Sequence, residues 1–265
     1  MSRQQTTLKS NPMNKQPLAR HATYKRLVWL ASIWSWPVCL VGTLATFMLI
    51  GGFIPPPKPS WTAQEIAAFF TAEPIHVRFG AMGFLYFTGT MILFYSVISE
   101  EIKKIEGEPA LLARIQISSA IILVTIFQLL GLAWLLASYR TDVSPDVIRM
   151  LNDYCWFCWS MFIPTYIVQY LCVAVAAFMD KRENPTWPRW AGWVNLWIAF
   201  GGAGGIAAVF FKAGPFAWNG LIGFWIPVIV YALGNCVNTW LMHRHYRIEQ
   251  DKPAVLSGPS LVTER

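Results

Sequence analysis

The sequence predicts an all-α integral membrane protein, a polytopic bundle of six transmembrane helices with both termini in the cytoplasm. Of its 265 residues, 55% are hydrophobic and 13% are charged, whereas soluble domains typically carry about 25% charged residues. Six apolar stretches each reach the roughly 20 residues that a helix needs to cross about 30 Å of hydrocarbon. No Asp, Glu, Lys or Arg falls near the middle of a stretch. Together these observations exclude a water-soluble domain.

Length and hydropathy place the six spans in chain order. They are predicted at Leu27–Ile54, Pro74–Ser99, Leu112–Ser138, Asp153–Met179, Trp190–Phe211 and Leu221–Met242. This divides the chain into a basic cytoplasmic tail over residues 1–26, a transmembrane domain over 27–247 and a second cytoplasmic tail over 248–265. The first tail is polar and has neither a short apolar core nor a small-residue cleavage site, so we expect it to be a tail and not a cleaved signal.

The distribution of basic residues predicts the orientation. With a cytoplasmic amino terminus, 16 of the 21 Lys and Arg residues fall on the inner side, and the exceptions are Lys58, Arg78, Arg140, Arg149 and Lys212. Such an excess indicates cytoplasmic termini in the plasma membrane, the inner membrane of a bacterium. The net charge of +7 lies beside membrane ends, so we expect the lipid bilayer and not nucleic acid as its partner.

Two loops on the predicted outer side carry helix-start signals. After the proline-rich run 55–59, Thr62 and Glu65 have the spacing of a capping box, and Ile66, Phe69 and Phe70 fall on one side of the short helix that follows. We expect this helix to lie on the outer bilayer surface or to plug the bundle. Residues 144–146, Ser-Pro-Asp, predict a second helix start that continues into the fourth span.

The sequence lacks the residues that several kinds of chemistry require. The histidines are His21, His76, His243 and His245; one lies in the tail and two at the inner membrane end. No set of them is expected to converge within the membrane, so we expect neither a metal nor another cofactor, including haem held by two histidines. Rhodopsin-like, rhomboid-like and ion-coupled carrier functions also lack a mid-span lysine, a serine with a histidine, and a buried carboxylate.

One cysteine motif suggests redox chemistry. Cys155 and Cys158 form a CxxC near the predicted outer end of the fourth span, where such a pair can exchange disulfides with a partner or pass electrons to a quinone. The outer loops contain no second cysteine pair to relay oxidation, and Cys155 lies too far inside its helix for the helix dipole to favour the thiolate. The alternative is a pair of small apolar residues.

Charged and aromatic residues gather at the predicted outer ends of the spans. We expect them to form an aromatic cup that binds an amphipathic molecule. The candidate ligand-binding residues are Asp153, Trp156, Trp159, Glu73, His76, Arg78, Lys212, Trp218 and Asn219. Asp153 is the strongest candidate, because it is the acidic group closest to the hydrocarbon. The alternative is that the charges cap helices, snorkel or pair locally, and that the tryptophans form an interfacial belt.

Polar residues deeper in the membrane are uncharged amides. They are Gln128, Gln169, Asn195, Asn235 and Asn238. Amides in hydrocarbon need partners, so they either bridge helices or line a cavity. Pro37, Pro164 and Pro227 fall within three spans, and glycines are concentrated over residues 201–205. Kinked helices that approach closely favour a pocket.

Three functions therefore remain open. The first is binding or facilitated passage of an uncharged hydrophobic or amphipathic small molecule through the outer cup. The second is a non-catalytic membrane subunit or assembly factor, whose partner would be another membrane protein. The third is a membrane enzyme acting on a lipid, sterol or quinone through Asp153, Glu73, His76 or the pair Cys155 and Cys158. The sequence identifies no catalytic residue that decides between them.

Overall fold

The computed structural model describes residues 15–140, 142–161 and 163–251, with side chains from residue 23. All regular structure in these residues is helical, and η marks segments of π or 3-10 helix. In chain order the elements are α1 (Lys15–Thr43), η2 (Leu44–Ile50), α2 (Ala63–Ala72), α3 (Pro74–Gly89), α4 (Met91–Glu106), α5 (Leu111–Tyr139), α6 (Pro145–Met161), α7 (Ile163–Met179), α8 (Arg189–Gly201), η3 (Gly202–Val209), η4 (Leu221–Trp225) and α9 (Ile226–Asp251).

The prediction of six apolar helices is confirmed. Six helical segments within the described residues are long and apolar enough to cross a membrane: Thr23–Ile50, Pro74–Glu106, Leu111–Tyr139, Pro145–Met179, Arg189–Val209 and Leu221–Asp251. The second and sixth run past the predicted Ser99 and Met242, and α1 begins at Lys15, inside the predicted tail. Hydropathy marks where the apolar side chains end, whereas backbone hydrogen bonding continues the helix into polar sequence.

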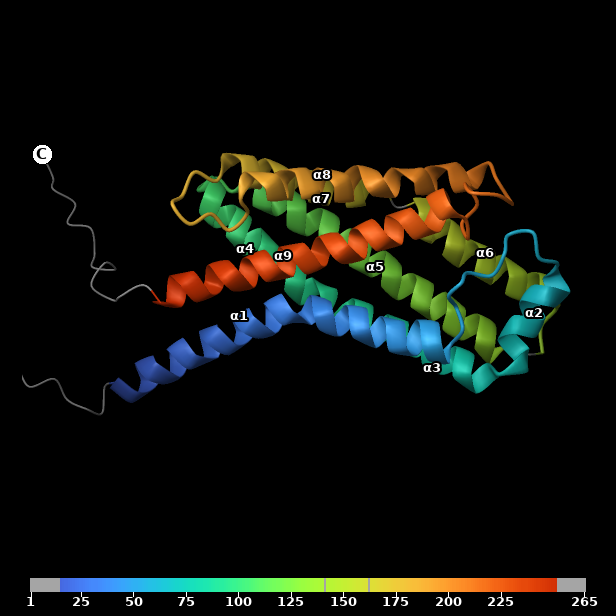
Figure 1. Ribbon diagram of the computed structural model, residues 1–265. Helices are drawn as coiled ribbons and strands as arrows, with labels where there is room; N and C mark the ends of the chain where they lie inside the picture. Colours follow the sequence, from blue (N-terminus) through green and yellow to red (C-terminus); the bar gives the residue numbers. More distant parts are fainter. Residues whose placement is uncertain (1–14, 141, 162, 252–265) are drawn as a thin grey trace, which may run out of the picture.

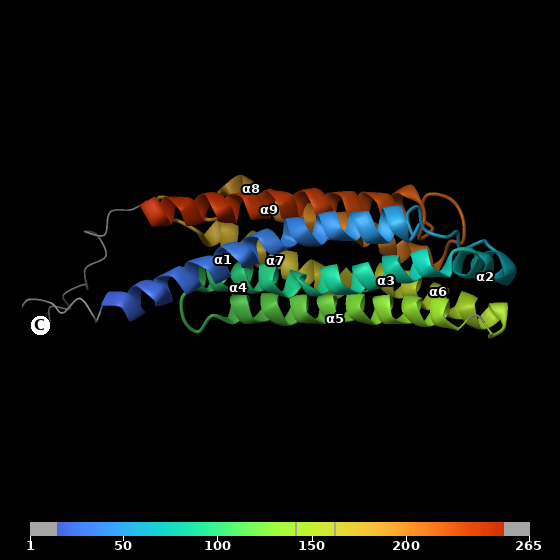
Figure 2. The ribbon, with the colours of Figure 1, turned by 90° about the horizontal axis from the view of Figure 1, so that it is seen from below.

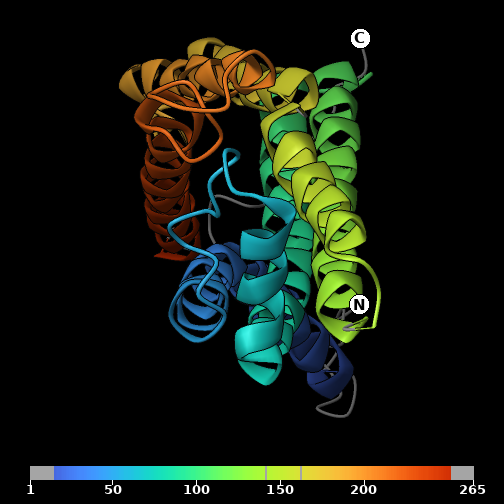
Figure 3. The ribbon, with the colours of Figure 1, turned by 90° about the vertical axis from the view of Figure 1, so that its right-hand side faces the viewer.

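The helices form one elongated bundle. α1 begins and α9 ends at the same end, called here the terminal end, and α2 lies at the opposite end, called the α2 end (Figures 1 and 2). α5 lies against α3 and α4 on one side and against α6 and α7 on the other, and α8 packs on α7 and α9. Seen along the bundle from the α2 end, α2 and its connecting loops lie across the helix ends (Figure 3).

The helix predicted after the proline-rich run is present as α2, and its capping box is complete. The backbone N–H of Glu65 donates to Thr62 Oγ1 at 3.2 Å, and the backbone N–H of Thr62 donates to Glu65 Oε2 at 2.7 Å. The Thr62 N–H and the Thr62 hydroxyl both donate to Glu65 Oε2, and these two hydrogen bonds lower the pKa of Glu65. Ile66 and Phe70 are buried, and the Phe70 ring lies 6.0 Å from that of Phe53. The apolar side of α2 therefore covers this end of the bundle.

Glycines allow η2 and α3 to touch through their backbones. A Cβ atom built on Gly80 would lie 2.5 Å from the Cα of Gly51, and one built on Gly83 would collide with the side chain of Thr46. Small residues permit this approach of helices in membranes, where packing is a main source of association. The contact holds the first and second spans together at the α2 end.

Stacked aromatic rings fill the core at the α2 end. The rings of Phe47 and Phe53 are nearly parallel, with centroids 4.4 Å apart. Trp134 lies 5.0 Å from Phe47 and 5.1 Å from Trp156. All four side chains are almost fully buried. This cluster joins η2, α5, α6 and the loop before α2, and Phe47 extends it to the wall of the cavity described next.

Candidate functional site

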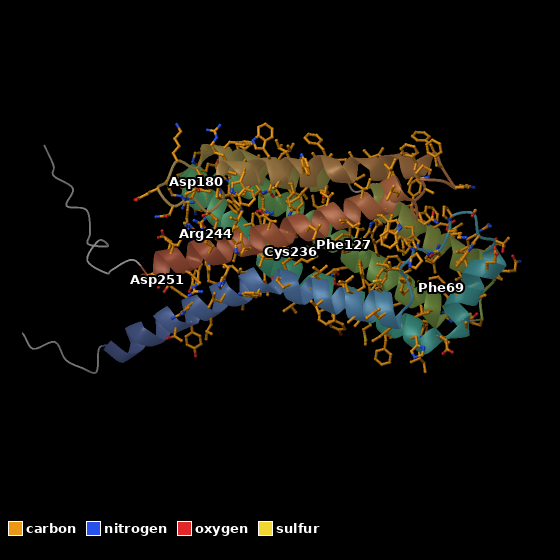
Figure 4. All side chains as sticks on the ribbon, viewed as in Figure 1. Phe69, Phe127, Asp180, Cys236, Arg244 and Asp251 are labelled. Atoms are coloured by element: carbon orange, nitrogen blue, oxygen red, sulfur yellow. The ribbon has the colours of Figure 1, made fainter. Side chains whose placement is uncertain are left out.

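An apolar cavity of about 160 Å³ lies inside the α2 half of the bundle. Its walls come from the first, second, third, fourth, fifth and sixth spans. Phe127 of α5 lies in its wall, and Figure 4 shows this side chain midway along the bundle, between Phe69 at the α2 end and Asp180 at the terminal end. The volume is close to that of an engineered cavity of about 150 Å³ that stays dry and binds benzene. The cavity thus has room for one ring.

One face of the first span, from Trp36 to Phe47, lines the cavity. The lining residues are Trp36, Cys39, Leu40, Thr43, Leu44 and Phe47. Their spacing of three and four residues places them on a single helical face. This regular spacing was present in the sequence as a signal, but the sequence alone does not say which face of a membrane helix meets protein and which meets lipid.

Three distorted helical segments surround the cavity. The π-helical η2, the 3-10 segment η3 and the π-helical η4 each contribute to its wall, through Leu44, Gly202 and Gly223. Pro227, just after η4, lines it as well, and proline has no N–H for the helical ladder. π-Helical turns inside membrane helices occur frequently at functional sites. The predicted pocket of kinked, glycine-rich helices therefore has a counterpart in this cavity.

Lining residues of the cavity are partly exposed on both η2 and the start of α9. These two segments diverge toward the α2 end (Figure 1), and both line the cavity. On one side Leu44 is 42% exposed. On the other side Pro227, Val228 and Ala232 are partly exposed. The lining is therefore accessible at both of these segments.

Hydrogen-bonded tyrosines border the deep end of the cavity. Tyr231 lines it, and its hydroxyl lies 2.6 Å from the Tyr95 hydroxyl. Tyr95 also lies 3.3 Å from the Tyr170 hydroxyl, which donates to Asn235 Oδ1 at 3.0 Å. Tyr166, another lining residue, donates to the backbone oxygen of Ile198. The network links α4, α7 and α9 and gives an otherwise apolar cavity one polar end.

Most of the predicted membrane amides join neighbouring helices. Asn195 and Asn238 form a reciprocal amide pair between α8 and α9, with distances of 3.1 and 2.9 Å. Gln128 of α5 donates to Thr88 of α3 at 3.0 Å, and Asn235 pairs with Tyr170 of α7. Gln169 is fully buried beside Tyr95. The alternative in which the amides bridge helices therefore describes Asn195, Asn238, Gln128 and Asn235.

The tryptophans of the predicted cup occupy different environments. Trp156 is fully buried, and its indole N–H donates to Asn152 Oδ1 at 3.1 Å. Trp159 lines the apolar cavity. Trp218 is 7% exposed and donates to the backbone oxygen of Pro57 at 2.9 Å. Trp218 thus ties the loop before η4 to the proline-rich loop before α2.

The cup residues at the start of α3 make local contacts. His76 Nδ1 lies 3.5 Å from Glu73 Oε2, and both side chains are well exposed. Arg78 donates through Nε and Nη2 to the backbone oxygen of Ser138, at 3.2 and 2.9 Å, at the end of α5. Arg78 also lies over the ring of Tyr139. Glu73 and His76 thus contact each other, Arg78 joins the start of α3 to the end of α5, and none of the three lines the apolar cavity.

The remaining cup residues lie nearer to the loop before η4. Asp153 accepts a hydrogen bond from Asn152 Nδ2 at 3.3 Å, with Lys212 and Arg149 as nearby cations. Lys212 and Asn219 line a separate polar hollow with Lys58. Neither this hollow nor the apolar cavity is lined by all nine predicted cup residues. Trp159 alone among them lines the apolar cavity.

The two cysteines of the CxxC are free thiols in different settings. Cys155 is fully buried, and its Sγ donates to the backbone oxygen of Leu130 at 3.5 Å. Cys158 is partly exposed and lines the cavity. Within the described part of the chain, no group of three or more His, Cys, Asp or Glu is placed to hold a metal ion.

At the terminal end the structure contains an ionic junction that the sequence analysis missed. It consists of Glu101, Lys104, Asp180, Arg182, Thr186 and His245. Glu101 is 3% exposed and accepts from Lys104 Nζ at 2.6 Å and from Thr186 Oγ1 at 2.8 Å. His245 Nε2 lies 3.8 Å from Glu101 Oε2. The junction ties α4 and α9 to the loop after α7.

We expect Asp180 of the junction to contribute to stability in a way that is lost in acid. Its side chain is fully buried and accepts from Arg182 Nη2 at 2.7 Å and from the Thr186 N–H at 3.0 Å. Burial alone opposes ionisation, but these hydrogen bonds and the charge of Arg182 outweigh it and lower the pKa of Asp180. A lowered folded-state pKa adds stability above the unfolded-state pKa of about 3.9, and this stability is lost as pH falls through the folded-state pKa.

Asp180→Asn should therefore reduce the free energy of unfolding at neutral pH by about 1.5–3 kcal/mol, the contribution of hydrogen bonds to a charged group. The difference from the wild type should shrink as the pH falls below the folded-state pKa. Unfolding titrations across this pH range measure it. Asp142→Asn is the control, because Asp142 is 74% exposed and lies 3.9 Å from Arg140. A difference that stays constant with pH would contradict the assignment.

Comparison with known proteins gives no relative: the chain matches no protein family, no curated protein and no solved structure.

Proposed function

We propose that the protein binds an uncharged hydrophobic or amphipathic small molecule, or facilitates its passage, and that the apolar cavity is the binding site. The observation that carries this proposal is a ring-sized apolar cavity with partly exposed lining residues on both η2 and α9. The proposal moves the site inward from the cup expected at the helix ends. Trp159 belongs to both.

The composition of the wall supports an uncharged ligand. Among the described residues, no Asp, Glu, Lys or Arg lines the cavity. A charged group placed there would lose its hydration without gaining a counter-ion, which is a large free-energy cost. The tyrosines at the deep end supply hydrogen bonds for a neutral polar group.

We also propose that the terminal end faces the cytoplasm in the plasma membrane of a bacterium. The excess of Lys and Arg in the segments on this side supports the orientation. The α2 end, with the cavity in its half of the bundle, then faces the outer leaflet, and the ligand enters from that leaflet.

Filling the cavity should abolish binding. We expect Ala232→Phe to reduce labelling by a photoreactive alkylbenzene at least tenfold, because Ala232 lines the cavity between η2 and α9. The measurement uses the purified protein in lipid nanodiscs and quantifies labelled peptides by mass spectrometry. Leu233→Phe is the matched control: Leu233 is the next residue on α9 and is 63% exposed.

Labelling should concentrate on the lining face of the first span, including Leu40 and Leu44. Equal labelling of wild type and Ala232→Phe, or labels spread only over lipid-facing positions such as Leu233, would contradict binding in the cavity.

A further inference from the structure

A polar hollow of about 350 Å³ lies apart from the apolar cavity. Its lining residues come from the proline-rich loop before α2, through Lys58 and Ser60, and from residues 212–221, which lead into η4. Both loops lie at the α2 end of the bundle (Figure 3). None of the residues that line the hollow also lines the apolar cavity. The hollow is therefore a separate candidate site.

A hydrogen bond fixes the two loops to each other beside the hollow. The indole N–H of Trp218 donates to the backbone oxygen of Pro57 at 2.9 Å. Lys58 and Asn219, which line the hollow, are the residues that follow these two in the chain. Backbone hydrogen bonds also close the second loop on itself. Side chains that are far apart in sequence are thus held around one hollow.

Two cations line the hollow, and no carboxylate does. They are Lys58 and Lys212, and neither forms an ion pair within the described part of the chain. Glu65 interacts electrostatically with Lys58, and Asp153 with Lys212, but neither carboxylate lines the hollow. Like charges placed together repel, so an anion bound between the lysines would be stabilised by both.

The donor groups of these side chains are open to a ligand. Lys58, Ser60 and Lys212 are exposed, and Asn219 is partly exposed. Each lysine carries three N–H donors on a flexible four-carbon chain, so its ammonium group can turn toward a ligand in the hollow. The serine hydroxyl and the asparagine amide add neutral donors. The hollow thus combines two positive charges with donors that an oxyanion can use.

We infer that the hollow binds a phosphate monoester group. At pH 7 such a group carries a charge of about −1.5 to −2 and three acceptor oxygens, which matches the two lysines. A phosphodiester carries one negative charge, as does a carboxylate, and either would leave one lysine without a counter-charge. Leu221, also in the lining, is 59% exposed and can contact the hydrocarbon of a lipid that carries the phosphate. The inference goes beyond the proposed function and does not depend on the apolar cavity.

The test measures how far phosphate protects the two lysines from acetylation. The protein is placed in phosphatidylcholine nanodiscs and treated with a neutral acetylating ester, and mass spectrometry gives each rate relative to Lys103. Lys103 lies outside the hollow, and its side chain is 51% exposed. Phosphatidic acid, a lipid phosphate monoester, should lower the relative rates at Lys58 and Lys212 about fivefold, as for ion pairs at an exposed site.

A phosphodiester lipid controls for membrane charge. Phosphatidylglycerol at twice the mole fraction gives the bilayer about the same charge as phosphatidic acid, and we expect it to change the relative rates little. Equal protection by the two lipids would overturn the inference, because membrane charge alone would explain it.

A water-soluble monoester distinguishes two sources of the phosphate. Protection by glycerol 3-phosphate, added to nanodiscs without phosphatidic acid, would identify soluble phosphate monoesters as ligands. Protection by phosphatidic acid alone would identify a lipid head group. Either result supports the site, and protection by neither overturns it.

Three variants test whether the lysines act together. Lys212→Gln should abolish the protection of Lys58, and Lys58→Gln should abolish that of Lys212, because one cation remains in each. Arg140→Gln is the matched control, since this side chain is 57% exposed and does not line the hollow. All three positions are exposed, where substitutions seldom change stability. Protection of Lys58 that survives in Lys212→Gln would overturn a site shared by the two lysines.

Discussion

Glu101→Ala is expected to lower the free energy of unfolding by about 3 kcal/mol or more, since each hydrogen bond to a charged group contributes about 1.5–3 kcal/mol. Glu101 is 3% exposed and accepts from Lys104 and Thr186. Its loss also leaves the buried His245 without the carboxylate 3.8 Å away. Reversible unfolding in mixed micelles, followed by tryptophan fluorescence, measures the change.

The neighbouring residue supplies the control for this prediction. Glu100 is exposed on the same helix, so Glu100→Ala should change the free energy by no more than about 0.5 kcal/mol. Glu101→Gln keeps the shape and one acceptor, and we expect a loss between the two. If Glu101→Ala behaved like Glu100→Ala, the ionic junction would not hold α4 and α9 to the loop after α7.

Gly80→Ala is expected to destabilise the protein by about 1–3 kcal/mol, the usual cost of forcing an extra methyl group into a packed interior. The new Cβ would lie 2.5 Å from the Cα of Gly51. Backbone cannot rotate away as a side chain can, so η2 and α3 must separate. The same unfolding measurement detects the loss.

Gly89→Ala serves as its control on the same helix. A Cβ at Gly89 would lie 3.6 Å from Gln128, an ordinary contact. Alanine also favours helix over glycine by about 1 kcal/mol, so this variant should be neutral or stabilising. Similar destabilisation of both variants would show that helix packing at Gly80 is not the cause.

The sequence predicted the number and position of the spans because apolar length alone selects a membrane helix. It placed their polar ends poorly for the same reason. Glu101 lies beyond the predicted end at Ser99, but the helix continues to Glu106 and buries this carboxylate. Its burial depends on Thr186 and His245, which come from distant parts of the chain.

The candidate site was less predictable. Charges and tryptophans predicted a binding site at the helix ends, where Glu73 and His76 lie next to each other. The cavity is lined instead by residues such as Trp36 and Tyr231, whose lining role arises when the first and sixth spans are brought together. The capping box of α2 was predictable, because both of its hydrogen bonds lie within four residues.

The exposure of cavity-lining residues on η2 and α9 changes which concentration governs occupancy. On the proposed function, the cavity samples molecules dissolved in the bilayer and not in water. Each additional methylene contributes about 0.8 kcal/mol to transfer from water, which raises the membrane concentration about fourfold. A longer hydrocarbon chain would then increase occupancy without touching the protein. Selectivity would come from the part of the molecule inside the cavity, and apparent potency from the hydrocarbon chain outside it.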